Sequence, residues 1–163
     1  MMMSKMKIAV STIKIECSKN PRKYDVDFEF MLFVSDDARD LFRYYNKTEF
    51  HGLNVHDCEK RIQSGGTYID GLVNYHPNDV DCQLAGRPFM FLNLKTMNEQ
   101  PIWKTAAMIS HESCHMSIII ETNFGNPDDS DGEREERVIS GMEQIANAVM
   151  ERLNFPKIFF QIG

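Results

Sequence analysis

The sequence predicts an α+β domain in which a small antiparallel or mixed sheet packs against two long helices. Three observations support this prediction. Short segments with strand-like alternation dominate the first half of the chain, and two long segments with helical periodicity dominate the second half. The 163 residues, 42% of them hydrophobic and 26% charged, are enough for one buried core. We therefore expect a single domain over residues 1–163.

The first two expected strands lie in the segments KIAVSTIKIEC and VDFEFMLFV. In the second segment, alternation places Phe28, Phe30 and Leu32 on one face. The turn-like SKNPRK between the segments favours antiparallel pairing. A short helix is expected in SDDARDLFRYYNK, with Ser35 or Asp36 as its N-cap. Residues 48–66 are not assigned to an element.

Two further strands and two long helices complete the expected fold. The strands are in TYIDGLVNYH and FMFLNLK, with a proline-containing loop between them. The first long helix is expected to begin near Pro101 and to end near Glu121 or Thr122. The second is expected over residues 131–153, where Ser130 and Glu133 have the spacing of a capping box.

Charge and composition exclude two classes of partner. The net charge of −6 argues against a nucleic-acid binder, because such proteins usually carry a basic face. A membrane-spanning helix needs about 18 to 20 consecutive apolar residues, and no stretch of the chain approaches that length. We therefore expect neither a nucleic-acid nor a membrane partner. The sequence does not indicate an oligomeric state.

The beginning of the chain and the cysteines together predict a cytoplasmic location. Lys5 and Lys7 precede an apolar run, but Lys14 and Glu16 interrupt it and no small-residue cleavage site follows. We therefore interpret the segment as a strand of the mature fold. The four cysteines form no CxxC pair, which favours reduced thiols.

The motif HESCH in the first long helix predicts a metal site. At about 100° per residue, His111 and His115 lie one turn apart on the same face, so their imidazoles converge at a distance that suits zinc. Glu112 projects beside that face, within reach of a metal-bound water, and is the expected general base. Small residues on another side of the helix permit close approach of a neighbour: Ala106, Ser110, Ser113 and Ser117.

HESCH, preceded by the strand FMFLNL and followed by an acidic helix, resembles the zincin metallopeptidases of the gluzincin type, and also small zincin-like proteins of bacteria and their phages. The resemblance covers about residues 89–150, whereas residues 1–60 match no family. It implies an edge strand, an HExxH helix and an acidic third-ligand helix over residues 89–153. The edge strand, expected at residues 89–94, would bind an extended substrate.

The resemblance also implies that a glutamate on the second long helix is the third zinc ligand. The pattern of apolar residues that follows the family's ligand favours Glu136, and Glu135 remains the alternative because it lies closer to the apolar stripe. Glu133 has a structural explanation in the capping box. Glu121 is excluded because no glycine at position 118 turns the chain towards it, so we expect a surface acid there.

These parts predict a zinc-dependent metallopeptidase that acts on protein or peptide substrates. Zn²⁺ held by His111, His115 and Glu136 would leave a position for water, which Glu112 deprotonates as it attacks the peptide carbonyl. Tyr75 and His76 are candidates for stabilising the oxyanion. The alternative is a non-catalytic zincin-like protein in which a structural zinc supports an interaction module. Neither Cys114 nor the cluster of His51, His56 and Cys58 is expected to form a metal site.

Overall fold

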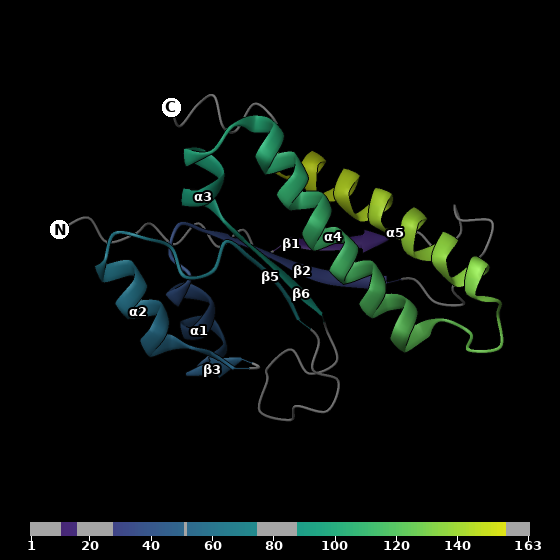
Figure 1. The fold of residues 1–163 in the computed structure, drawn as a ribbon, viewed down its shortest axis with the longest axis horizontal. Coiled ribbons are helices and arrows are strands. Elements are labelled where there is room, and N and C mark those ends of the chain that lie inside the picture. The colour runs from purple at the N-terminus through teal and green to yellow at the C-terminus, as the bar shows by residue number, and fades with distance from the viewer. Residues whose placement is uncertain (1–10, 16–27, 51, 75–87, 156–163) are drawn as a thin grey trace.

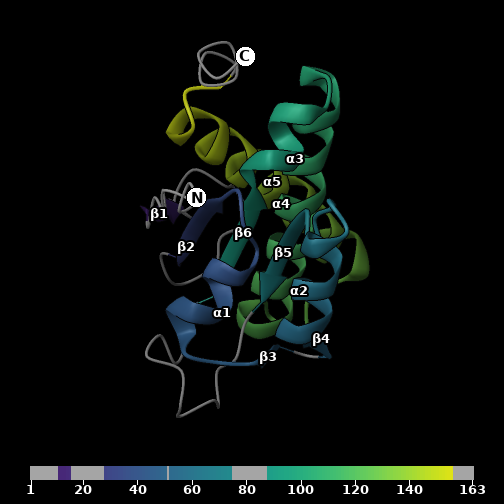
Figure 2. The same ribbon diagram turned by 90° about the vertical axis from the view of Figure 1, so that its left-hand side faces the viewer.

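A mixed sheet lies between two layers of helices (Figures 1 and 2). The computed structural model describes residues 11–15, 28–50, 52–74 and 88–155. The elements follow in the order β1 (Ser11–Ile15), β2 (Phe28–Ser35), α1 (Arg39–Tyr45), β3 (Glu49–Phe50), β4 (Leu53–Asn54), α2 (Val55–Gln63), β5 (Gly71–Asn74), β6 (Phe89–Asn93), α3 (Leu94–Glu99), α4 (Ile102–Phe124) and α5 (Asp131–Arg152). The predicted α+β class is therefore confirmed.

The main sheet has the strand order β1-β2-β6-β5. β1 and β2 are antiparallel, as predicted, with Ile13 opposite Phe30. β2 pairs with β6 in parallel and β6 pairs with β5 in antiparallel fashion. The expectation of an edge strand at residues 89–94 is wrong, because β6 is hydrogen-bonded on both sides. Its FMFLN run is buried throughout, which is the pattern of an internal strand, and among the described strands β5 lies at that edge instead.

Both faces of the sheet are covered, by different helices. Phe28, Phe30 and Leu32 share one face, as predicted, and pack with the apolar sides of α4 and α5. Met31 and Phe33 point the other way, into a second cluster with residues of α1 and α2. Figure 2 shows α1 and α2 on the side of the sheet away from α4 and α5. The two long helices thus form one outer layer of the molecule.

The long helices begin and end close to the predicted positions. Pro101 is the N-cap of α4, and the hydroxyl of Ser130 caps α5 by accepting a hydrogen bond from the backbone N–H of Glu133 at 3.2 Å. No described helix has both the length and the apolar character that a membrane span requires.

The start of α1 differs from the prediction. Ala38 occupies the N-cap position, not Ser35 or Asp36. Ser35 still belongs to β2, and its hydroxyl donates to the carboxylate of the buried Asp40 at 2.5 Å. Because Ser35 is still in the strand and is hydrogen-bonded to Asp40 in the helix, a turn lies between them. The helix therefore begins at Arg39, later in the chain than predicted.

Two helices that the sequence analysis did not assign both begin at an asparagine. The side chain of Asn54 accepts a hydrogen bond from the N–H of His56 at 2.7 Å and caps α2. Asn93 ends β6 and caps α3, accepting from the N–H groups of Lys95 and Thr96 at 3.0 and 3.3 Å. Asparagine ahead of a helical run is a recognised start signal, so these caps were visible in the sequence.

α4 and α5 pack closely and in opposite directions. The predicted small-residue stripe makes the contact: Ser117 lies so close to Gly141 that a side chain at Gly141 would overlap its hydroxyl. That hydroxyl donates to the carbonyl of Val138 at 2.7 Å. One turn further along α4, Glu121 meets α5 at Arg134 and Arg137.

The prediction that Glu121 is a surface acid is wrong, because Glu121 is buried and ion-paired. Arg137, also buried, donates to its two carboxylate oxygens at 2.8 and 2.6 Å, and Arg134 donates at 3.0 Å. Asp129 accepts a further bond from Arg137 at 2.6 Å. These contacts hold the pKa of Arg137 above its usual range and lock the start of α5 to the end of α4.

We expect Glu121→Ala to lower the free energy of unfolding by about 3 kcal/mol. This value is at the lower end for a broken buried pair, because Asp129 still accompanies the uncompensated Arg137. Chemical denaturation measures the change. Glu151→Ala, which removes an exposed carboxylate from the same helix layer, serves as the control and should change stability by less than about 0.5 kcal/mol. Equal effects of the two substitutions would contradict the assigned role of Glu121.

Candidate metal-binding and catalytic site

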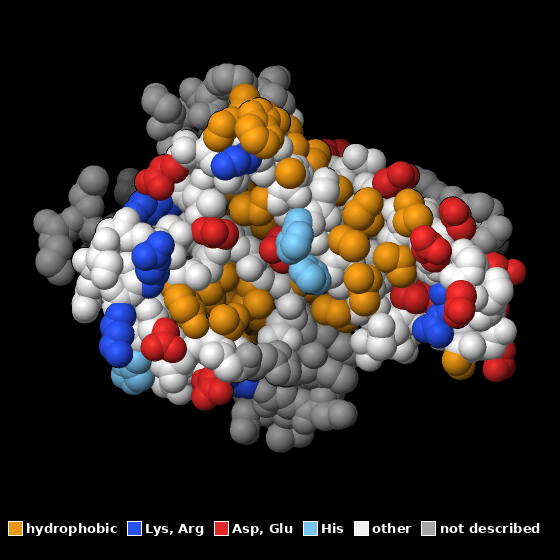
Figure 3. Space-filling model, viewed as in Figure 1, with side chains coloured by type: hydrophobic (Ala, Val, Ile, Leu, Met, Phe, Trp, Pro, Cys, Tyr) orange, Lys and Arg blue, Asp and Glu red, His pale blue; other side chains and the backbone are white. Residues whose placement is uncertain are grey.

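His111 and His115 converge on one point above the exposed side of α4. Their Nε2 atoms are 3.1 Å apart and their rings are nearly perpendicular, at 81°. Two nitrogens bound tetrahedrally to the same zinc ion at the usual bond length are about 3.3 Å apart. Figure 3 shows two adjoining histidines in the middle of the face that α4 crosses. At 3.1 Å the two nitrogens are within hydrogen-bond distance of each other, and their separation is also close to that of a chelating pair.

The orientation of α4 follows from its apolar side. Ile109, Met116 and Ile120 are buried in the core beneath the helix. Helical periodicity then turns His111 and His115 outwards, where both are exposed. The core thus determines which residues of the motif face solvent.

Glu112 lies on the side of α4 that faces the edge strand β5. It is 7% exposed, and its carboxyl is packed against Gly71, the first residue of that strand. Burial raises the pKa of Glu112, and the nearby His111 acts in the opposite direction. A shielded carboxyl of raised pKa is a form that general-base chemistry uses.

The acidic residues predicted to complete the site are not close to the histidines. Glu135 and Glu136 are exposed at the start of α5, whose next residues are tied to Glu121 and Ser117 of α4. Ser117 is two positions beyond His115 and therefore about 160° around the helix from it. The start of α5 thus lies beyond the second histidine along α4 and on another side of that helix.

Among the described residues, no group of three or more His, Cys, Asp or Glu side chains is placed to hold a metal ion. The structure brings together His111, His115 and Glu112 but does not bring Glu136, or its alternative Glu135, to them. The reason is the packing of α5, which buries Arg137, Gly141, Ile145 and Val149 and leaves the neighbouring glutamates in solvent.

The other residues singled out in the sequence lie apart from this site or outside the described ranges. Tyr75, His76 and His51 belong to the part of the chain that the structure does not describe. Cys58 is buried in α2, not placed in a surface loop, and burial raises the pKa of its thiol to about 11. His56, two residues before it, is exposed.

The structure also supplies a residue that the sequence analysis did not single out. This residue is Gly71 of β5. Because it has no side chain, the side chain of Glu112 packs directly against the backbone of the strand. Its signal in the sequence was a glycine inside a strand-like segment, which often marks close approach of another group.

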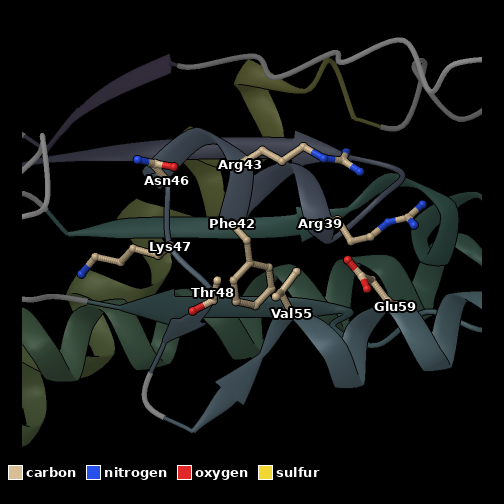
Figure 4. A pocket seen from close by; sticks show the side chains of 8 residues that line it. All are labelled: Arg39, Phe42, Arg43, Asn46, Lys47, Thr48, Val55 and Glu59. Atoms are coloured by element: carbon tan, nitrogen blue, oxygen red, sulfur yellow. The ribbon is translucent and has the colours of Figure 1, made fainter.

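A hollow of about 250 Å³ lies between α1 and α2 (Figure 4). Its lining includes Arg39 and Arg43, but each is already paired with a carboxylate, Asp37 and Asp40 respectively, at 2.7 Å. Because α1 and α2 cover the other face of the sheet, this hollow is separate from the histidine pair.

Comparison of the chain with protein-family models, with curated proteins and with solved structures finds no match. The assignment of a function therefore depends on the geometry of His111, Glu112 and His115.

We expect Glu112→Gln to raise the thermal stability of the metal-free protein at neutral pH. The folded state raises the pKa of Glu112, so its charged form opposes folding, and this destabilisation grows as pH rises through the folded-state pKa. Well below the unfolded-state value both proteins carry a neutral side chain, and their melting temperatures should agree. Thermal unfolding in chelator across this pH range checks the prediction; a constant difference at all pH values would contradict it.

Proposed function

We propose that this protein is a zinc-dependent peptidase with a zincin-like arrangement of strand and helix, acting on protein or peptide substrates in the cytoplasm. The single observation that carries the proposal is the pair of imidazole nitrogens 3.1 Å apart beside the buried carboxyl of Glu112. The ion network of Glu121, by contrast, is occupied by Arg134 and Arg137.

His111 and His115 would hold the zinc ion through Nε2, because these are the atoms that converge. When bound, zinc supplies a Lewis acid that lowers the pKa of a coordinated water and polarises a carbonyl group. Both imidazoles are exposed, so the fourth partner of the site, water or substrate, has open access to them. A histidine pair buried inside the core would lack this access.

Glu112 is the proposed base. It follows His111 directly, and its carboxyl is near enough to that histidine to sense its charge, which supports a role in which Glu112 would take a proton from a water and return it to the leaving amine. Its burial supports this role, since a carboxylate whose pKa is raised is a stronger base than an exposed one.

The edge strand β5 favours an extended peptide as the substrate. Among the described strands β5 pairs with β6 alone, so it is the last strand on that side of the described sheet. Gly71, in this strand, touches Glu112, so a peptide paired along β5 would pass beside the proposed base. This assigns to β5 the role that the sequence analysis expected of residues 89–94.

The experiment that tests this function is zinc analysis of the purified protein together with a peptide-cleavage assay. We expect about one zinc per chain in the wild type, loss of zinc in His115→Ala, and retention in Glu112→Gln. Cleavage should be lost in both variants. His56→Ala is the matched control, because it removes an exposed histidine from α2 and should change neither property.

Each alternative has its own signature in the same experiment. A wild type without zinc, even after refolding with it, would overturn the proposal. Zinc bound through His115 without cleavage of any peptide would instead support the non-catalytic alternative, a structural zinc in an interaction module.

The third protein donor requires a separate test. Glu136 is the donor that the family resemblance predicts, but to reach the histidines it would have to break the contacts between Arg137 and Glu121. From the packing of α5 we expect Glu136→Gln to keep the zinc affinity of the wild type. Calorimetric titration measures that affinity, with Glu133→Gln as the control in the same helical turn. A drop of tenfold or more in Glu136→Gln alone would show that α5 packs differently when zinc is bound.

A further inference from the structure

We propose that Gly71 is a positioning residue for Glu112: its missing side chain creates the space in which the carboxyl of the general base stands. This inference rests on the proposed function. It concerns the placement of the base and not the binding of the metal.

The contact is close and specific. A Cβ atom at position 71 would stand 2.6 Å from Oε1 of Glu112, 2.8 Å from its Cδ and 2.9 Å from its Cγ. The three nearest atoms all belong to this one side chain. Such distances are shorter than van der Waals contact, so Glu112 and a side chain at position 71 cannot both occupy this space.

The requirement for glycine here is one of space and not of backbone conformation. Gly71 is absent from the glycines of positive φ, which are Gly52 and Gly65. Alanine is therefore compatible with the backbone of β5. The closest contacts of a methyl group there would be with the side chain of Glu112.

The strand is held firmly, so the carboxyl and not the strand must give way. Gly71 pairs with Leu92 of β6. The residue before it, Asp70, accepts a backbone hydrogen bond from Asn93 at 2.8 Å, and its carboxylate accepts bonds from the hydroxyls of Thr67 and Thr96 at 2.8 and 2.6 Å.

A further hydrogen bond holds Ile69, the residue before Asp70. The side-chain amide of Asn93 donates to the carbonyl of Ile69 at 3.0 Å. Because Asn93 is also the cap of α3, the end of β6, the start of α3 and the start of β5 are fixed to one another. The backbone of β5 at Gly71 therefore cannot move away from Glu112 without breaking several hydrogen bonds.

Displacement of the carboxyl would affect catalysis more than binding. A base must stand within about 2.6 to 3.2 Å of the proton that it removes. A misplacement of about 1 Å can reduce the rate on the order of 100-fold. We therefore expect Gly71→Ala to reduce kcat by about 10- to 100-fold while KM and zinc content stay at wild-type values.

Gly132→Ala is the matched control for this substitution. Gly132 lies in the first turn of α5, and a Cβ there meets nothing within 4 Å. The same chemical change should therefore leave kcat, KM and zinc content unaltered. A loss of zinc in Gly71→Ala, or a fall in kcat of the same size in Gly132→Ala, would overturn the positioning role.

A second measurement reports the contact without any activity. In a double-mutant cycle of melting temperatures, Gly71→Ala should lower Tm by about 2 to 4 °C in the wild-type background, as for a loss of about 1 kcal/mol in a domain of this size. In the Glu112→Ala background, where the carboxyl is gone, it should cause no decrease. Equal shifts in the two backgrounds would show that the contact does not exist and would overturn the proposal.

The two measurements separate the failure of this inference from that of the proposed function. Coupled melting temperatures with an unchanged kcat would overturn the positioning role and leave the peptidase intact. A wild type that cleaves no peptide would overturn the proposed function and the catalytic meaning of Gly71 with it, whatever the melting temperatures show.

Discussion

Burial of one side of α4 against the sheet is the interaction on which the rest of the structure depends. Ile109, Met116 and Ile120 enter the core together with the apolar face of β2. Each such side chain contributes about 1.5 to 3 kcal/mol when fully buried, so rotation of the helix about its axis would be strongly opposed. That fixed rotation turns the two imidazoles to solvent and the carboxyl of Glu112 to β5. The core therefore determines the positions of these three side chains.

The polar contact between α4 and α5 has a comparable influence over a shorter range. Arg137 places two donors on Glu121, and both residues are buried, so any shift of α5 along α4 would leave charges uncompensated. The contact of Ser117 with Gly141 sets the distance between the helices in the same region. Together they explain why the acidic start of α5 faces solvent and does not complete a metal site.

The sequence was sufficient for features that depend on local periodicity. The two long helices, the antiparallel pair of β1 and β2, and the convergence of His111 with His115 all follow from spacing alone. Features set by tertiary packing were not accessible in this way. The internal position of β6 depends on the order of strands in the sheet. The burial of Glu121 depends on Arg137, which lies on another helix. α2 and α3 are different, because their asparagine caps, Asn54 and Asn93, are local signals from which both helices could have been predicted.

Gly71 and Glu112 also differ in whether local sequence or tertiary packing reveals their role. The glutamate is part of a recognisable motif, whereas the glycine has meaning only through a neighbour about forty positions away in the sequence. A short motif therefore identifies candidate residues but not the surface against which they pack. The identity of that surface requires the pairing of β5 with β6.

The parallel pairing of β2 with β6 has a kinetic consequence. It joins distant parts of the chain, with Leu32 opposite Met90, and such contacts form late because a large loop must close first. The helical turn that brings the two imidazoles together is local and forms on a much shorter time scale. The separation of the two imidazoles therefore depends on contacts within one helical turn, whereas the position of Gly71 against Glu112 depends on the slower pairing of distant strands.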